Sequence, residues 1–311
     1  MNLRRLKRVL ACWGVLGLIG TSGSGVAHAD LVFSLNFTPQ AQADLSAAQQ
    51  GLFADALGYW DDWIIGHRDG VNRTWQLTVD TFSQPAATGG GVLLGYGGYS
   101  ALALTNVVPG AHTSDGRFYI STAGQVTFNV HPDAGSLAAN LILHEIAHAL
   151  GFGSLWELNQ VYNDGVAGNT FRTLVGGQPG QYVGSAALAA YRQEFVGQSA
   201  ATFVPVELAG GAGTAHGHWN EQDNFGQALT GIVDSLGRDM RDELMTGWSS
   251  PTGNVFVSQT TVQSLVDIGF TVRAVPEPAA GLGQVLVAAV GLLFCRRRAA
   301  AARTGELSVI P

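Results

Sequence analysis

The stretch that decides the fold is HEIAHALGFG, residues His144 to Gly153. Histidines four residues apart lie one turn apart on the same face of an α-helix, so the imidazoles of His144 and His148 can reach one metal ion. Glu145 is rotated by about 100° from His144 around the helix axis, near enough to act on a water molecule at the metal without being a ligand. The stretch therefore predicts a helix that carries two zinc ligands and a general base.

The residues around this motif are strongly apolar and predict a helix from Ser136, as its N-cap, to Leu150. Gly151 follows at the position where a glycine commonly ends a helix. Burying two imidazoles and a carboxylate among leucine and isoleucine side chains costs several kcal/mol unless a partner satisfies them. We therefore expect a metal site here and not a plain core helix.

A catalytic zinc site needs a third protein ligand and one position open to water. The metzincin metallopeptidases supply this ligand from the pattern H-E-x-x-H-x-x-G-x-x-H, in which the glycine turns the chain back to the metal. Gly151 stands at the glycine position, but Ser154 occupies the position of the third histidine. The third ligand is therefore expected further along the chain.

The stretch from His144 to Gly153 resembles the leishmanolysin-like metzincins of bacterial type, in which a long insertion displaces the third histidine and a tryptophan follows it. The resemblance implies that His218, which a tryptophan follows here as well, is the third zinc ligand. His216 is the rival for this role, because it lies only two residues earlier. The segment ELMTG resembles the methionine turn of bacterial members, which implies that Met245 lies beneath the zinc ion.

The resemblance covers about Ser136 to Val272 and implies an α+β fold of the metzincin-like zincin type. We expect an N-terminal mixed sheet with two long helices, one of them the active-site helix. An irregular C-terminal subdomain should hold a large insertion and the methionine turn. The expected divisions are a leader over 1–29, an N-terminal catalytic subdomain over 30–151, a C-terminal subdomain over 152–273 and a sorting segment over 274–311.

Hydrophobic spacing places the other elements. Apolar residues recur at helical spacing from Ala41 to Ile65, which predicts one long helix, and they alternate with polar residues around Trp75 to Val79 as in a half-buried strand. Val126 to Val130 is expected to be an edge strand that pairs an extended substrate. Further strands and helices are expected near Val92 to Leu94, Phe118 to Ser121, Ala186 to Phe195 and Thr260 to Ile268, the last with a capping box from Thr260 and Gln263.

Residues outside the motif carry weaker signals. Histidines in turn or loop contexts, His67 among them, are expected at the surface or in turns. Trp156, Trp219 and Trp248 are expected to be packing residues, although any of them could line the substrate cleft.

The two ends are expected to address the chain to membranes and not to join the fold. Residues 1–29 have a basic start, an apolar stretch and the small-residue ending AHA, as in a secretory signal peptide. The sequence VPEP at 275–278 precedes an apolar helix and an arginine cluster, which resembles the PEP-CTERM sorting signal. The resemblance implies an exosortase-type processing protease as partner. The protein would be exported through the inner membrane and reach the cell surface or the medium after processing, or otherwise stay anchored and face the periplasm.

Composition narrows the function further. The chain has 311 residues, 23 acidic against 16 basic side chains and a net charge of −7, and half of the basic side chains lie in the two ends. An acidic domain with so few cations is a poor partner for nucleic acid, and the membrane is expected to be contacted only through the C-terminal segment. The two cysteines exclude a disulfide framework and a cysteine-rich zinc site.

Together these patterns predict a zinc-dependent endopeptidase that acts on protein or peptide substrates. One Zn²⁺ held by His144, His148 and His218 would activate a water molecule, and Glu145 would take its proton as general base. Two alternatives remain open: a non-catalytic surface or biofilm-matrix protein on the same fold, and a zinc hydrolase of a non-peptide substrate. The intact Glu145 favours an enzyme, because a purely structural zinc site needs no neighbouring base.

Overall fold

A four-stranded mixed sheet forms the first half of the fold. The computed structural model describes residues 30–88, 92–162, 179–211, 213–221, 228–248 and 253–273. The strand order is β1-β3-β5-β4. The parallel strands are β1 (Leu31–Phe37), β3 (Arg73–Phe82) and β5 (Tyr119–Asn129), and β4 (Gly95–Leu104) runs antiparallel to β5. This α+β arrangement with a mixed sheet agrees with the expectation from the sequence.

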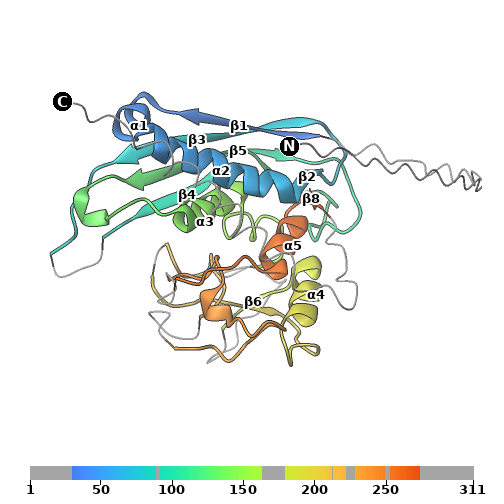
Figure 1. The fold of residues 1–311 in the computed structure, drawn as a ribbon. Coiled ribbons are helices and arrows are strands. Elements are labelled where there is room, and N and C mark those ends of the chain that lie inside the picture. Colours follow the sequence, from blue (N-terminus) through green and yellow to red (C-terminus); the bar gives the residue numbers. More distant parts are fainter. Residues whose placement is uncertain are drawn as a thin grey trace, which may run out of the picture.

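Three helices accompany this sheet: α1 (Pro39–Asp44) and α2 (Ala47–Trp63), which precede β2 (Ile64–His67), and α3 (Ala139–Leu150), which follows β5. Figure 1 shows α3 in green beneath the sheet, between it and the C-terminal half. The indole Nε1 of Trp60 on α2 donates to the carbonyl oxygen of Leu143 on α3 at 3.1 Å. Phe53 of α2 packs edge-on against Phe128 of β5. α2 thus contacts both the helix that carries the motif and the sheet.

The C-terminal half is built on two helices and short strands. Its elements are β6 (Gly180–Tyr182), α4 (Ser185–Glu194), β7 (Val204–Val206), α5 (Gln259–Asp267) and β8 (Phe270–Val272). A 3-10 turn at Met240–Asp242 precedes α5, and another at Pro132–Ala134 precedes α3 in the first half. β6 and β7 pair with each other. β8 returns to pair antiparallel with β2, which joins the last described strand to the first half of the fold.

The helices α4 and α5 cap each other. Glu194, the last residue of α4, accepts hydrogen bonds at 3.0 Å from the backbone N–H groups of the first two residues of α5. Asp267, the last residue of α5, accepts at 2.8 and 2.9 Å from the N–H groups of the second and third residues of α4. Burial raises the pKa of both carboxyls. Each carboxyl thereby satisfies donors that the start of a helix leaves without an intrahelical partner.

Two expected helix starts are wrong, because local capping decides them. The expected helix over 41–65 is two helices, since Ser46 caps α2 in a capping box with Gln49 and interrupts the apolar run. Ser136 is not the N-cap of α3. That position is Ala138, which makes no side-chain capping bond.

The last helix also starts differently. The capping box of Thr260 and Gln263 is wrong, because Ser258 is the N-cap of α5 and its Oγ accepts from the N–H of Thr261 at 3.0 Å.

The expected end of α3 is confirmed, since Gly151 caps it with a left-handed φ of 118°.

The edge strands of the four-stranded sheet are β1 and β4, and not the strand that the sequence favoured. Most of Val126 to Val130 belongs to β5, which pairs on both sides, so the expected edge strand there is wrong. Most of Phe118 to Ser121 belongs to β5 as well, and Val92 to Leu94 only precedes β4. The sequence of β4, GYGGYSALAL, hides a strand because glycine is rare in strands.

Glycine in β4 allows this strand to run directly against α3. A Cβ atom at Gly97 would lie 2.1 Å from the carbonyl oxygen of Glu145, which is closer than any packing tolerates. At Gly98, the next residue in the same strand, the same atom would meet open space. The edge strand β4 therefore packs closely at Gly97 against the turn of α3 that carries the motif.

We expect Gly97→Ala to destabilise the protein and Gly98→Ala to leave its stability nearly unchanged. The methyl group at 97 must push β4 away from α3, and overpacking of this kind costs about 1–3 kcal/mol. In a domain of this size such a cost lowers the melting temperature by several degrees. Thermal unfolding followed by circular dichroism measures the difference, and equal melting temperatures for the two variants would contradict the packing described here.

The expected surface position of His67 is wrong. The residue is 2% exposed, and its ring stacks on Phe270 of β8 with centroids 4.8 Å apart. Burial lowers the pKa of His67 to about 4. The sequence context suggested a turn, but the return of β8 to β2 covers it.

The two ends lie outside the described residues, as does 163–178 of the expected insertion. The rest of that insertion holds β6, α4 and β7. Among the described helices, none is both long and apolar enough to cross a membrane.

Candidate metal centre

Three imidazoles converge beside α3. The Nε2 atoms of His144 and His148 lie 3.0 Å apart on this helix. His218 lies 70 residues beyond His148, and its Nε2 is 3.0 Å from that of His144 and 2.9 Å from that of His148. These three residues form a group that could hold a metal ion.

The other ring nitrogen of each histidine faces a backbone carbonyl. The Nδ1 atoms of His144, His148 and His218 lie 2.7, 3.0 and 2.8 Å from the carbonyl oxygens of Leu244, Phe152 and Thr214 respectively. A carbonyl oxygen can only accept, so each Nδ1 carries the proton and donates it. Each Nε2 is then left with a free lone pair directed at its two counterparts. Metal-binding histidines are commonly oriented in this way.

Burial keeps the three imidazoles neutral. It lowers the pKa of His148 to about 3 and moves those of His144 and His218 below their ordinary range. Three unprotonated nitrogens about 3 Å apart repel one another unless a cation lies between them. Three neutral imidazoles are also a donor set that zinc accepts, so the residues present fit this metal.

The structure does not bring His216 into the group. Its Nδ1 lies 2.9 Å from the hydroxyl oxygen of Tyr162. Its backbone adopts a left-handed φ of 68°, which turns the chain sharply between the two histidines. The imidazole that joins the group is therefore that of His218.

The loop that carries His218 rests on the segment around Met245. The N–H of Trp219 donates to the carbonyl oxygen of Met245 at 3.0 Å. A Cβ atom at Gly247 would lie 2.2 Å from the methyl group of Thr214, so the loop approaches this closely only because residue 247 is glycine. Met245 itself is fully buried.

Residues at the start of α5 bind the two segments next to His218 and next to the carbonyl that faces His144. The Nε1 of Trp219, the neighbour of His218, donates to Thr261 Oγ1 at 2.8 Å. The same hydroxyl donates to Glu243 Oε1 at 2.6 Å, and the Ser258 N–H donates to that oxygen at 3.0 Å. Glu243 directly precedes the carbonyl that orients His144, and burial raises its pKa to about 7.

Glu145 lies next to the group on α3 and is 7% exposed. Burial raises its pKa to about 7, although a hydrogen bond with the backbone of Gly97 favours the ionised form. Glu145 lines a cleft together with His144 and His218. A carboxyl whose pKa lies near neutrality can both accept a proton and give it back.

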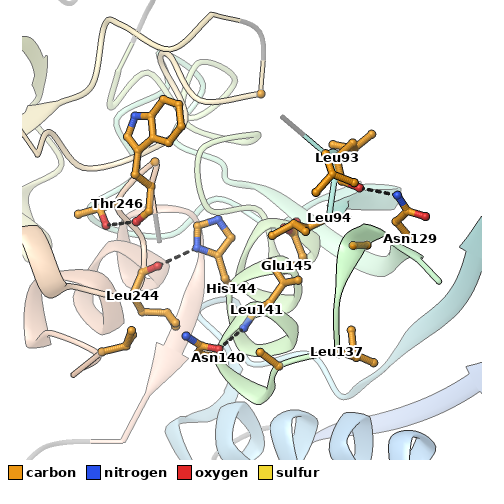
Figure 2. Close-up of a pocket in the computed structure, with 18 of the residues that line it drawn as sticks. Leu93, Leu94, Asn129, Leu137, Asn140, Leu141, His144, Glu145, Leu244 and Thr246 are labelled. Atoms are coloured by element: carbon orange, nitrogen blue, oxygen red, sulfur yellow. Dashed lines mark hydrogen bonds between the residues drawn. The ribbon is translucent and has the colours of Figure 1, made fainter. Parts of the chain in front are cut away.

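The cleft has a volume of about 440 Å³, and both polar and apolar residues line it. In Figure 2, Leu93 and Leu94 lie on one side of Glu145, and Leu244 and Thr246 lie on the other side of His144. Its larger apolar lining residues are Val92, Leu93, Leu94, Leu137, Leu141, Leu244, Trp248 and Val255. Within the described part of the chain, no lysine or arginine lines it.

The sequence missed the wall of this cleft at 92–95. No motif marks that segment, which directly precedes β4 and continues into its first residue. Of the three tryptophans, Trp156 and Trp219 are buried and Trp248 lines the cleft.

A leishmanolysin homologue from Crithidia fasciculata is 29% identical to this chain over 137 residues. The chain resembles the leishmanolysins. The match covers 43% of this chain and only 17% of the leishmanolysin homologue, and no family model matches the chain. The resemblance and the three-histidine group together hint at a zinc peptidase of a leishmanolysin-like family.

Proposed function

We propose that this chain is a zinc-dependent endopeptidase in which His144, His148 and His218 hold one zinc ion and Glu145 is the general base. The observation that carries the proposal is the convergence of three Nε2 lone pairs within 3.0 Å of one another. A carboxyl that lines the same cleft adds the group that a hydrolase needs. The leishmanolysin resemblance supports the choice of peptide bonds as the substrate.

A zinc ion in this group would polarise the carbonyl of the scissile bond and lower the pKa of a water molecule. Glu145 accepts a proton from the water while the water oxygen bonds to the carbonyl carbon. The Glu145 carboxyl then donates this proton to the leaving nitrogen as the C–N bond breaks. Its pKa of about 7 allows it to hold the proton between these two steps.

β4, and not β5, would pair with an extended substrate. It is the edge strand nearest α3, and the segment before it lines the cleft. An extended peptide can add to such an edge through backbone hydrogen bonds. The substrate would thereby pass Glu145 in an extended conformation.

We further propose that the chain is of the bacterial type of this family and that it is exported. The leader-like sequence at 1–29 supports export, and VPEP at 275–278 with the following apolar and basic segments supports sorting by an exosortase-type protease. After processing, the peptidase would act at the cell surface or in the medium.

Metal removal tests the proposal directly. We expect the purified full chain to contain about one zinc per molecule and to cleave casein, to lose both zinc and activity with 1,10-phenanthroline, and to regain both when zinc is added. A zinc-loaded chain that leaves casein and unfolded peptides intact would instead be the non-catalytic surface protein. Hydrolysis of ester substrates alone would indicate the hydrolase of a non-peptide substrate.

A further inference from the structure

The buried amide of Asn129 ties together three separate segments at one wall of the cleft. Its Nδ2 donates to the carbonyl oxygens of Gln84 at 2.7 Å and Leu93 at 2.9 Å. Its Oδ1 accepts from the N–H groups of Gln84 and His131, both at 3.0 Å. The side chain is 6% exposed. Its four hydrogen bonds connect the chain after β3, the chain before β4 and the chain after β5.

Only an amide can make this set of bonds. Two carbonyl oxygens need donors and two N–H groups need an acceptor, and among side chains of this length asparagine alone offers both. An aspartate of the same shape could accept from the two N–H groups but would place a carboxylate oxygen against two carbonyls. The bond to Leu93 would then be lost.

The segment that Asn129 holds is a wall of the cleft. The backbone N–H of Asn129 also donates to the carbonyl oxygen of Leu94 at 2.8 Å. The carbonyls of two successive residues of the wall, Leu93 and Leu94, therefore both bind Asn129. The side chain of Leu93 remains 50% exposed and lines the cleft. Figure 2 shows the Asn129–Leu93 bond beside Leu94 and Glu145.

The wall leads directly into the strand that meets the general base. β4 begins at Gly95, and Gly97 lies against the backbone of Glu145. A shift of the wall would therefore change the width of the cleft between Leu93 and the opposite side, where Leu244 lies. An exposed leucine held rigidly at such a place is suited to contact an apolar side chain of a bound peptide.

We propose that Asn129 is a positioning residue for substrate binding, which holds Leu93 as the contact for an apolar substrate side chain. The inference rests on the proposed function, because it assigns a role in the same cleft. It separates substrate binding from chemistry, since the hydrogen bonds of the Asn129 side chain go to Gln84, Leu93 and His131 and not to the three imidazoles or Glu145. Loss of the Asn129–Leu93 bond should weaken peptide binding and leave the chemical step and the metal in place.

The test compares Asn129→Asp with Asn159→Asp in the full-length protein. Asn159 is a matched control, because its buried amide also joins two segments, with bonds to the N–H and carbonyl of Tyr119 and to the carbonyl of Leu155. It does not line the cleft. We expect both variants to melt at lower temperature and to keep their zinc. For a leucine-containing fluorogenic peptide, Asn129→Asp should raise KM at least about fivefold with kcat within about twofold of wild type, whereas Asn159→Asp should change neither.

Leu93→Ala covers the case in which Asn129→Asp fails to fold, because this side chain is half exposed and its removal leaves the core intact. It should also raise KM with little change in kcat. An unchanged KM for Leu93→Ala, or a fall in kcat alone for Asn129→Asp, would overturn the inference.

Binding of the same labelled peptide, measured by fluorescence anisotropy, separates this inference from the proposed function. If wild type binds the peptide without cleaving it, the peptidase proposal fails. An increase in Kd of at least about fivefold for Leu93→Ala would then still support Leu93 as the contact for an apolar peptide side chain. If wild type neither binds nor cleaves the peptide, both proposals are wrong.

Discussion

Glu145→Gln is expected to lower peptidase activity by about a thousandfold while the protein keeps its fold and its zinc. A general base contributes roughly 10²–10⁴ to the rate, and the amide of glutamine cannot accept the proton. Glutamine has nearly the same volume, so the packing of α3 against Gly97 stays in place. The zinc content should not change, because the three Nε2 atoms come from other residues. Steady-state kinetics with a peptide and elemental analysis of zinc measure the two results.

Asp55→Asn is the matched control, because it makes the same carboxyl-to-amide change at an exposed position on α2. Its activity should equal that of wild type. Wild-type activity in Glu145→Gln would remove Glu145 from the mechanism. Loss of zinc together with activity would show that Glu145 acts on the metal site and not as a base.

The second large effect is expected from the pair His218→Asn and His216→Asn. His218→Asn should weaken zinc binding by more than about 100-fold, because the loss of a residue that only orients a ligand already costs about 10–100-fold. His216→Asn should keep the wild-type affinity, since His216 contacts Tyr162 and not the other two imidazoles. Asparagine tolerates the left-handed backbone at 216, so this change adds little strain.

Competition with a chromophoric zinc chelator gives the affinity of both variants. A loss of zinc in His216→Asn with retention in His218→Asn would reverse the assignment of the third imidazole. Wild-type affinity in both variants would mean that neither His218 nor His216 is a zinc ligand.

Local spacing predicted the part of the site that lies on one helix. The four-residue separation of His144 and His148 places both rings on one face of α3 whatever the rest of the chain does. His218 lies 70 residues away in a loop, and only the family resemblance pointed to it. The choice against His216 depends on a left-handed backbone angle, which no spacing in the sequence reveals.

The elements that the sequence misplaced depend on contacts between distant segments. β4 contains three glycines, of which Gly97 is required by the close approach of α3, but read alone these glycines suggest turns. His67 is buried by β8, which lies some 200 positions later and cannot be inferred from the residues near His67. The wall at 92–95 depends on the amide of Asn129, and no motif in the sequence marks this residue.

The mutual capping of α4 and α5 bears on when the three-histidine group can assemble. Neither helix satisfies its own first N–H groups fully without the carboxyl at the end of the other helix. The start of α5 also holds Trp219 and Glu243, which flank the third imidazole and the carbonyl behind the first. A chain still being synthesised lacks α5 until almost all of the described domain has been made. In such a chain the HEIAHALGFG helix is present before the contacts of α5 that support the segments of His218 and Leu244.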